Sequence, residues 1–188
     1  MGQATPAIQQ LIALSRLYGV SIDSMVMPET DCGMAQYKHA RREPSVIIPF
    51  LLRAKRQTYA GKGLEISASR TASHDYQYRE GEMLYYDTYL GSEQFAGQEA
   101  VWVAEQPLWS MDYQGRVLAE GFSGDFLKQA LLHGTPENPF RGPSRFTQGE
   151  WLYQCSWKGS FAWFTGEESI WRAENKIYGC LFHGGTLK

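Results

Sequence analysis

One carboxylate interrupts a row of aromatic residues in a strongly strand-like stretch, Met83-Leu84-Tyr85-Tyr86-Asp87-Thr88-Tyr89. Alternate residues of a strand share a face, so Asp87 lies on the same face as Tyr85 and Tyr89. A carboxylate on such a face must be hydrogen-bonded or exposed, because burying it without a partner is costly. We therefore expect Asp87 to be a ligand-binding acid or a general base. The alternative is a residue near the strand end that water or a nearby arginine satisfies.

Two further carboxylates occupy matching places in two glycine turns. Glu99 ends Phe-Ala-Gly-Gln-Glu, and Glu168 ends Phe-Thr-Gly-Glu-Glu. If the two segments face each other, the carboxylates converge, and a pair of neighbouring acids can do acid–base work because each raises the pKa of the other. The alternative is structural: each glutamate accepts backbone N–H groups and stabilises its own hairpin.

A polar stretch, Ser69-Arg70-Thr71-Ala72-Ser73-His74-Asp75, precedes the first strand-like segment. Arg70 is suited to clamp a carboxylate or phosphate, and His74 is a candidate acid or base. The alternative is a surface loop. Serine, histidine and aspartate that are adjacent in sequence cannot form a catalytic triad together. No histidine and cysteine set has zinc spacing, and no phosphate loop or dinucleotide fingerprint is present, so we expect neither a metal nor a cofactor.

The composition describes a protein with ample material for a packed core and little affinity for nucleic acid. Of the 188 residues, 43% are hydrophobic, and the formal net charge is -2. No apolar run is long enough for a membrane-spanning helix. Cys32, Cys155 and Cys180 are odd in number, which favours buried thiols in a reduced, cytoplasmic protein; a single Cys155–Cys180 disulfide is the alternative.

The elements that must position these residues follow from the hydrophobic pattern. An apolar stripe at helical spacing predicts a helix from about residue 46 to Gly61, and Ser123 or Asp125 caps a second helix that ends at Leu132. Strand-rich blocks are expected at about 76–118 and 150–187. Residues 29–43 lack a sustained apolar pattern and are interpreted as a linker.

The two strand-rich blocks match each other. Gly81-Glu82-Met83-Leu84-Tyr85 corresponds to Gly149-Glu150-Trp151-Leu152-Tyr153. Identical pairs continue along both blocks: Gly91/Gly159, Phe95/Phe164, Gly97/Gly166, Glu99/Glu168, Trp102/Trp171 and Gly115/Gly184. Similar residues fill other places, with Tyr89/Trp157 and Tyr113/Phe182, while Asp87 matches Cys155. Such long internal matches indicate duplicated supersecondary units.

We therefore predict an α+β fold, a tandem pseudo-two-fold repeat of a helix followed by about four antiparallel strands, preceded by a short helical N-terminal segment. The predicted domains are an N-terminal segment at 1–28, the linker at 29–43 and a duplicated domain at 44–188. Its two repeats fall at about 44–121 and 122–188. The alternative is a single, larger antiparallel sheet or barrel.

The N-terminal segment resembles part of a known DNA-binding family. Thr5 and Pro6 begin a helix with an apolar stripe, Gly19 ends it, and Ser21 caps a shorter helix that Pro28 stops. This pattern resembles the last two helices of Xre/Cro-type helix-turn-helix regulators, and the segment reads as a remnant without the recognition helix. The resemblance implies contact with DNA only through a missing N-terminal part. Apolar side chains of residues 6–27 predict docking on the main domain or a homodimer.

Residues 44–188 are similar to an uncharacterised bacterial domain that commonly follows such a helix-turn-helix. The similarity runs through Phe50-Leu51-Leu52-Arg53-Ala54-Lys55, Ser73-His74-Asp75, Tyr86-Asp87-Thr88-Tyr89, Phe95-Ala96-Gly97, Trp109-Ser110-Met111-Asp112-Tyr113 and Gly124-Asp125-Phe126-Leu127-Lys128. It implies a transcriptional regulator and no known activity. Our leading hypothesis is accordingly a domain that senses a small-molecule ligand or binds a partner, and not an enzyme.

The expected pocket is aromatic and rimmed by charged residues. Its predicted ligand-binding residues are Arg70, His74, Asp87, Glu99, Trp109, Tyr113 and Glu168. The competing hypothesis is an enzyme that acts on a small polar substrate through Asp87, Glu99 and His74; convergence of these side chains in one concave site would favour it.

Overall fold

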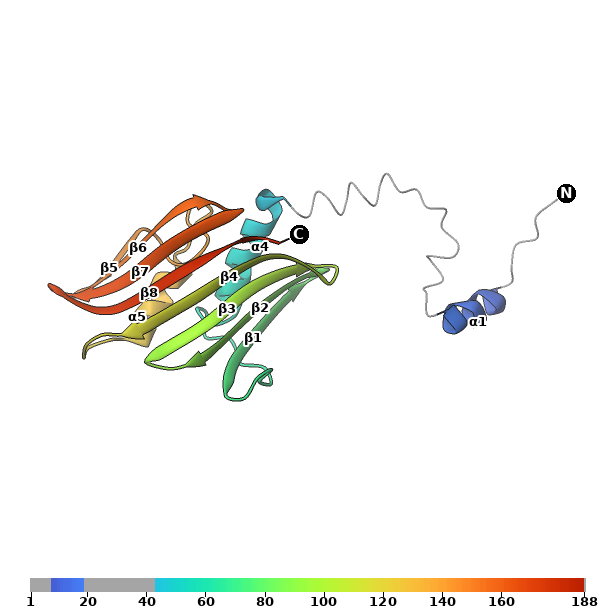
Figure 1. The fold of residues 1–188 in the computed structure, drawn as a ribbon, viewed down its shortest axis with the longest axis horizontal. Coiled ribbons are helices and arrows are strands. Elements are labelled where there is room, and N and C mark those ends of the chain that lie inside the picture. Colours follow the sequence, from blue (N-terminus) through green and yellow to red (C-terminus); the bar gives the residue numbers. More distant parts are fainter. Residues whose placement is uncertain (1–7, 19–42, 188) are drawn as a thin grey trace. The chain divides into compact units, whose positions relative to one another are not determined.

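The computed structural model describes residues 8–18 and 43–187, and the chain divides into two compact units, Met1–Ala40 and Arg41–Lys188 (Figure 1). In the first unit, helix α1 (Ile8–Tyr18) matches the first helix predicted there. Its Ile12, Leu14 and Leu17 are exposed. The predicted shorter helix after Ser21 and Cys32 lie outside the described residues, and the predicted docking or dimerisation of this segment stays a prediction.

The second unit is built on one sheet of eight antiparallel strands in the order β1-β2-β3-β4-β8-β7-β6-β5 (Figure 1). The first four strands are β1 (Ser73–Glu80), β2 (Met83–Gly91), β3 (Gln94–Val103) and β4 (Gln106–Val117). The last four are β5 (Arg145–Gln148), β6 (Trp151–Ser160), β7 (Trp163–Arg172) and β8 (Asn175–Thr186). Helix α4 (Pro44–Gln57) precedes the first group, and α5 (Gly124–Leu132) precedes the second.

The predicted α+β fold with two tandem helix-and-strand units is wrong, because the protein is largely β and its strands form a single sheet. The alternative of a larger antiparallel sheet describes it better. Strands β4 and β8 pair continuously from Trp109↔Thr186 to Val117↔Tyr178. This pairing satisfies two strand edges that separate units would leave open, and unpaired edges are a liability in any sheet.

The residue correspondence between the two blocks reappears in the strand register. Asp87 lies opposite Glu99, as Cys155 lies opposite Glu168. Each block has a register irregularity at the matched place, beside Trp102 in β3 and beside Trp171 in β7. At the centre of the sheet, Tyr113 of β4 pairs with its own counterpart, Phe182 of β8. Matched residues therefore occupy matched positions about the β4–β8 seam.

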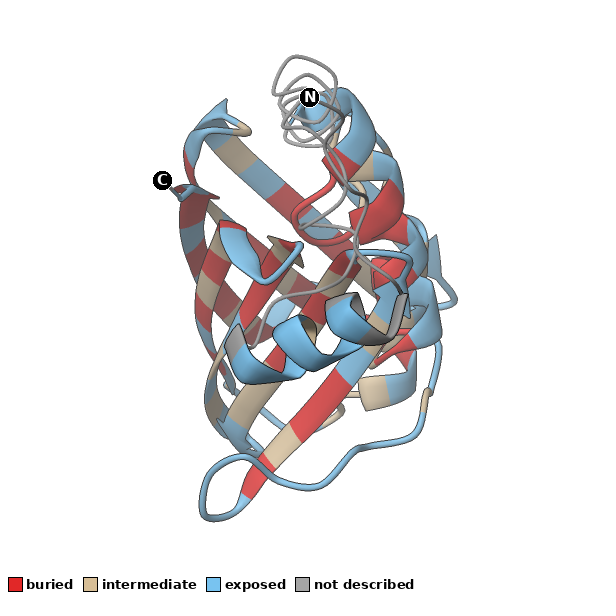
Figure 2. Cartoon of the chain, turned by 90° about the vertical axis from the view of Figure 1, so that its right-hand side faces the viewer, coloured by how far each residue is buried: buried red, intermediate tan, exposed pale blue. Residues whose placement is uncertain are grey.

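Burial alternates along the strands because one face of the sheet carries the two helices (Figure 2). We call this helix-covered side the inner face. In α4, a stripe that includes Ile47, Leu51 and Lys55 is buried, and this helix contacts β1, β2 and α5. Helix α5 begins as predicted at Ser123, whose Oγ accepts a hydrogen bond from the Phe126 backbone N–H at 3.2 Å.

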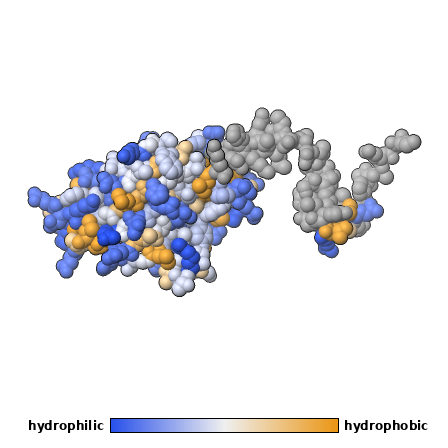
Figure 3. Space-filling view, in the orientation of Figure 1, coloured by the Kyte–Doolittle hydropathy of each residue, from blue (hydrophilic) through white to orange (hydrophobic). Residues whose placement is uncertain are grey.

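Aromatic side chains fill much of the inner face. Trp109 is fully buried and stacks on Phe161 and Phe164, with ring centroids 5.5 and 5.9 Å away. The visible surface of this unit mixes hydrophilic side chains with small apolar patches (Figure 3). Among the described helices, none combines the length and apolar character needed to cross a membrane.

Candidate functional site

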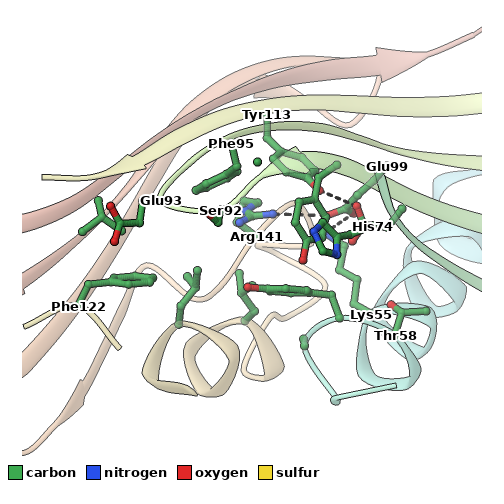
Figure 4. Close-up of a pocket in the computed structure, with 18 of the residues that line it drawn as sticks. Lys55, Thr58, His74, Ser92, Glu93, Phe95, Glu99, Tyr113, Phe122 and Arg141 are labelled. Carbon is green, nitrogen blue, oxygen red and sulfur yellow. Dashed lines mark hydrogen bonds and ion pairs between the residues drawn. The ribbon is translucent and has the colours of Figure 1, made fainter. Parts of the chain in front are cut away.

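A cavity of about 520 Å³ lies between the inner face of the sheet and helices α4 and α5 (Figure 4). Strands β1 to β4 supply one wall, and the end of α4, the segment that leads into α5 and α5 itself supply the other. The aromatic members of its lining are Tyr59, Tyr85, Tyr89, Phe95, Tyr113 and Phe122. Its charged members are Lys55, Asp87, Glu93, Glu99, Glu120 and Arg141. The cavity thus combines apolar walls with a few polar groups, as ligand sites commonly do.

Asp87 is a buried acid at the wall of this cavity. It is only 5% exposed, and its Oδ1 accepts a hydrogen bond from the Tyr113 hydroxyl at 2.7 Å. Burial, with the adjacent Glu99 carboxylate adding to it, raises the pKa of Asp87 to about 7. The Tyr113 hydrogen bond and the charges of Arg141 and Lys55 oppose this shift without cancelling it. Asp87 therefore changes its charge within the physiological range.

Glu99, in contrast, is ion-paired with a buried lysine. Its Oε2 lies 2.7 Å from Lys55 Nζ, and both side chains are almost completely buried. Lys55 Nζ also donates to the backbone carbonyl of Phe140. Burial lowers the pKa of Lys55, and Glu99 works against that lowering. The pair fixes the end of α4 against β3, because separating either partner would leave a buried charge uncompensated.

Arg141 connects the two matched glutamates. Its guanidinium lies 2.7 Å from Glu168 Oε1 and 3.6 Å from Glu99 Oε1. Tyr153 and Tyr178 also donate hydroxyl hydrogen bonds to Glu168, at 2.6 and 2.9 Å. Burial alone would raise the pKa of Glu168, but Arg141 and these hydrogen bonds lower it. Glu168 therefore has a structural role, and it is not among the residues that line the cavity.

The predicted convergence of the two glutamates is thus indirect. Glu99 and Glu168 share Arg141, and each carries a cation or hydroxyl partner of its own. The alternative of glutamates that accept backbone N–H groups in a hairpin does not describe them, since their hydrogen bonds and ion pairs are with side chains.

The side chains of the predicted polar stretch, residues 69–75, do not all face the cavity. His74 lines the cavity, where its ring stacks on Tyr89 at 4.7 Å and its Nδ1 lies 3.1 Å from Glu65 Oε1. Arg70 does not line the cavity; its exposed guanidinium donates to the Thr88 hydroxyl at 2.8 Å. The expectation that Arg70 rims the pocket is therefore not met. Arg70 lies in the turn before β1 and reaches Thr88, whose side chain is on the face of β2 opposite Asp87 and Tyr89.

Asp75 belongs to the face opposite His74. It is completely buried, and it accepts hydrogen bonds from the Ser69 backbone N–H and from the hydroxyls of Tyr86 and Thr88. Burial would raise the pKa of Asp75, yet these hydrogen bonds hold it well below its usual range. Its role is to fasten the preceding turn to β1 and β2.

Of the two remaining predicted site residues, one lines the cavity and the other does not. Tyr113 lines the cavity and holds Asp87, whereas Trp109 belongs to the aromatic core and does not reach the cavity. Cys155 and Cys180 are free, buried thiols, and burial raises the pKa of each to about 12. They flank Glu168 from β6 and β8, two strand spacings or about 9.5 Å apart, which is too far for a disulfide.

Sequence reasoning missed Lys55 and Arg141, the two cations of the cavity. Lys55 did carry a signal, because it follows Ile47 and Leu51 at helical spacing on the buried stripe of α4. Arg141 had none, since it lies in a proline-rich loop and reaches its partner 27 residues away along the chain. Within the described residues, no group of three or more histidine, cysteine or acidic side chains is placed to hold a metal ion.

In the described part of the chain, an aromatic side chain fills the matched position on the other half of the inner face. Phe140 occupies it, with its ring 3.7 Å from Phe164, 4.8 Å from Trp157 and 6.5 Å from Phe182. These three residues are the counterparts of Phe95, Tyr89 and Tyr113, which line the open cavity. Where that cavity has Asp87, the filled half has Cys155. The open space and Asp87 therefore occur together in one half of the sheet, whereas the buried acid of the filled half, Glu168, is held by Arg141 and two tyrosine hydroxyls.

Comparison with protein-family models matches residues 87–187 to the family described as "Domain of unknown function (DUF5680)". The match begins at Asp87 and includes strands β3 to β8. No curated protein and no solved structure matches the chain.

Proposed function

Because the chain belongs to the DUF5680 family, whose description names no activity, we propose a function from the geometry of its own cavity: the second unit binds a small organic molecule between the sheet and helices α4 and α5. The observation that carries this proposal is the cavity of about 520 Å³ with a buried, organised charge cluster at its wall. A volume of this size is typical of small-molecule sites. A protein gains no stability by leaving such a space open, because filled cores are more stable.

The contrast between the two halves of the sheet supports the same proposal. One half closes its inner face with Phe140, whereas the other leaves the matched space open and places Asp87 in it. We further propose that binding serves as a sensor in a transcriptional regulator. The support for this part is the resemblance of residues 5–28 to the end of a helix-turn-helix domain. In that family a recognition helix contacts DNA, and residues 5–28 do not include it, so binding to DNA would require a recognition helix outside this segment.

An enzyme that uses Asp87, Glu99 and His74 is the second candidate. All three residues line one cavity, and an acid with a pKa of about 7 suits proton transfer at neutral pH. Against it, no hydrogen bond or ion pair connects the three with one another in the described part of the chain. Glu99 is held by Lys55, and His74 by Glu65 and Tyr89. Binding without catalysis is therefore the better supported function.

Filling the mouth of the cavity tests the proposal. Ala119 lines the cavity and is exposed, so Ala119→Trp adds a large side chain there without disturbing the core. The matched control is Ala162→Trp, since Ala162 is exposed in the turn between β6 and β7 and lines none of the pockets described.

We expect a fragment library, followed by ligand-observed NMR, to give compounds that bind the full chain and the control but not Ala119→Trp. Compounds that bind all three proteins equally would contradict a site in this cavity. A library without any binder would contradict the proposed function itself.

A further inference from the structure

The buried charges beside the cavity leave one acid, Asp87, outside every ion pair of the described residues. This inference rests on the proposed function and concerns the ligand that Asp87 selects. Lys55 is paired with Glu99, and Arg141 with Glu168 and Glu99. Two buried cations thus balance two buried glutamates. Among the ion pairs of the described residues, none includes Asp87, whose hydrogen-bond partner is the neutral Tyr113 hydroxyl.

The cationic groups of the cavity are poorly placed to receive an anionic ligand. Lys55 Nζ is committed to Glu99 and to the Phe140 carbonyl. Both terminal nitrogens of Arg141 face glutamates, and its Nε, which has no hydrogen-bond partner, is buried out of reach of solvent even though the cavity is open. An anion would therefore have to displace a buried ion pair, at the cost of leaving a glutamate uncompensated.

The acids of the cavity favour a cation instead. The aromatic lining, which includes Tyr59, Tyr89 and Phe95, offers apolar surface that accepts a hydrocarbon body. Lys128 Nζ already lies over the Tyr59 ring, 4.6 Å from its centroid, and the His74 ring stacks on Tyr89, so the preference for a cation rests on the acids. Glu93 and Glu120, both exposed, also line the cavity and add negative charge at its open side. Figure 4 shows Glu93 far from Lys55. A negative mouth raises the local concentration of a cationic ligand.

We propose that this cavity binds a small organic cation, a protonated amine with an apolar body, whose charged group pairs with Asp87. When the free protein carries a protonated Asp87, the carboxylic acid loses its proton to solvent, and the resulting carboxylate pairs with the ammonium group. The buried acid thereby exchanges a proton for the ligand cation, and the charge of the cluster stays balanced.

Three indole compounds with one body and different charges test the inference: tryptamine (cation), tryptophol (neutral) and indole-3-acetate (anion). Calorimetric titration of the full chain should show tryptamine binding at least about tenfold more tightly than either analogue at pH 8. Affinity for tryptamine should rise by nearly tenfold per pH unit below the pKa of Asp87, and level off above it. Titration in buffers with different ionisation enthalpies should show one proton released at pH 6.

The matched variants are Asp87→Asn, which keeps the shape and the acceptor for Tyr113, and Glu167→Gln, an acid-to-amide change at an exposed residue of β7. Asp87→Asn should abolish both the preference for tryptamine and its pH dependence, and Glu167→Gln should retain them. Thermal melting confirms that each variant is folded.

Equal binding of tryptophol and tryptamine, or undiminished tryptamine binding by Asp87→Asn, would overturn the cation inference and leave small-molecule binding standing. Failure of wild type to bind any of the three at millimolar concentration would also overturn it, and the fragment screen then decides the proposed function separately.

Discussion

Asp87 and Glu99 lie directly opposite each other on β2 and β3, and Glu99 but not Asp87 is ion-paired with a lysine. This asymmetry separates the roles of two neighbouring carboxyl groups. Glu99 is held by Lys55 and Arg141 in a structural cluster, whereas Asp87 is an acid whose charge depends on pH and on what enters the cavity.

Replacing Asp87 with asparagine should stabilise the protein in a pH-dependent way. The folded-state pKa of about 7 lies above that of an unfolded aspartate, so folding favours the protonated acid, and stability falls as pH rises from about 4 to about 7. Because asparagine does not ionise, the Asp87→Asn variant should not lose this stability as the pH rises. Urea unfolding should therefore show the variant more stable than wild type at pH 8 and similar to it near pH 4.

Asp75→Asn is the control for this experiment, because the same change at Asp75 should lower the stability of the protein instead of raising it. Its hydrogen bonds hold the pKa of Asp75 low despite burial, so its contribution to stability is present at neutral pH and is lost on acidification. This variant should be less stable than wild type at pH 7. A stability difference between Asp87→Asn and wild type that does not change with pH would contradict a titrating Asp87.

Removing the shared arginine should destabilise the fold. Arg141→Met leaves Glu168 and Glu99 buried with less compensating charge, an effect that commonly costs about 3–5 kcal/mol. The free energy of unfolding from urea titration measures it. Glu168→Gln in the same chain should recover part of the loss, because it removes one uncompensated anion. Equal destabilisation by the single and double changes would mean that the two residues do not interact energetically.

Adding a methyl group at Gly97 should disturb the support of Asp87. A Cβ there would lie 2.5 Å from the Tyr113 ring and 2.6 Å from Tyr89 Cβ, so the tyrosine that donates to Asp87 must move. We expect a loss of about 1–3 kcal/mol in stability. Gly124→Ala is the control, since no atom lies within 4 Å of its added Cβ. A neutral Gly97→Ala would show that Tyr113 is not held closely against β3.

The two cysteines beside Glu168 should be unreactive in the folded protein. Burial raises the pKa of Cys155 and Cys180 to about 12, so little thiolate exists at pH 8. With Cys32 replaced by serine, a colorimetric thiol reagent should label neither cysteine until denaturant is added. Rapid labelling of the native protein would show that the inner face opens around β6 to β8.

The sequence by itself was sufficient for the local elements. The apolar stripe of α4, the Ser123 cap of α5 and the alternation of β2 depend on residues within one or two turns or along one strand, so their periodicity shows directly in the sequence. The same alternation identified Asp87 as an acid on an aromatic face. The matched residues of the two blocks were visible in the sequence, but the repeat of separate helix-and-strand units predicted from them was wrong.

Only the tertiary structure decided how these elements combine. Pairing of β4 with β8 makes one sheet, and this choice depends on which strand edges remain open after the local hairpins form, which no local pattern encodes. The same long-range packing brings Arg141 to Glu168, directs Arg70 away from the cavity and places Phe140 in one half of the inner face. The sequence thus determined which faces carry acids and aromatic rings. The tertiary contacts determined which acids are ion-paired and which half of the inner face contains a cavity, because burial and charge pairing depend on groups far apart in the chain.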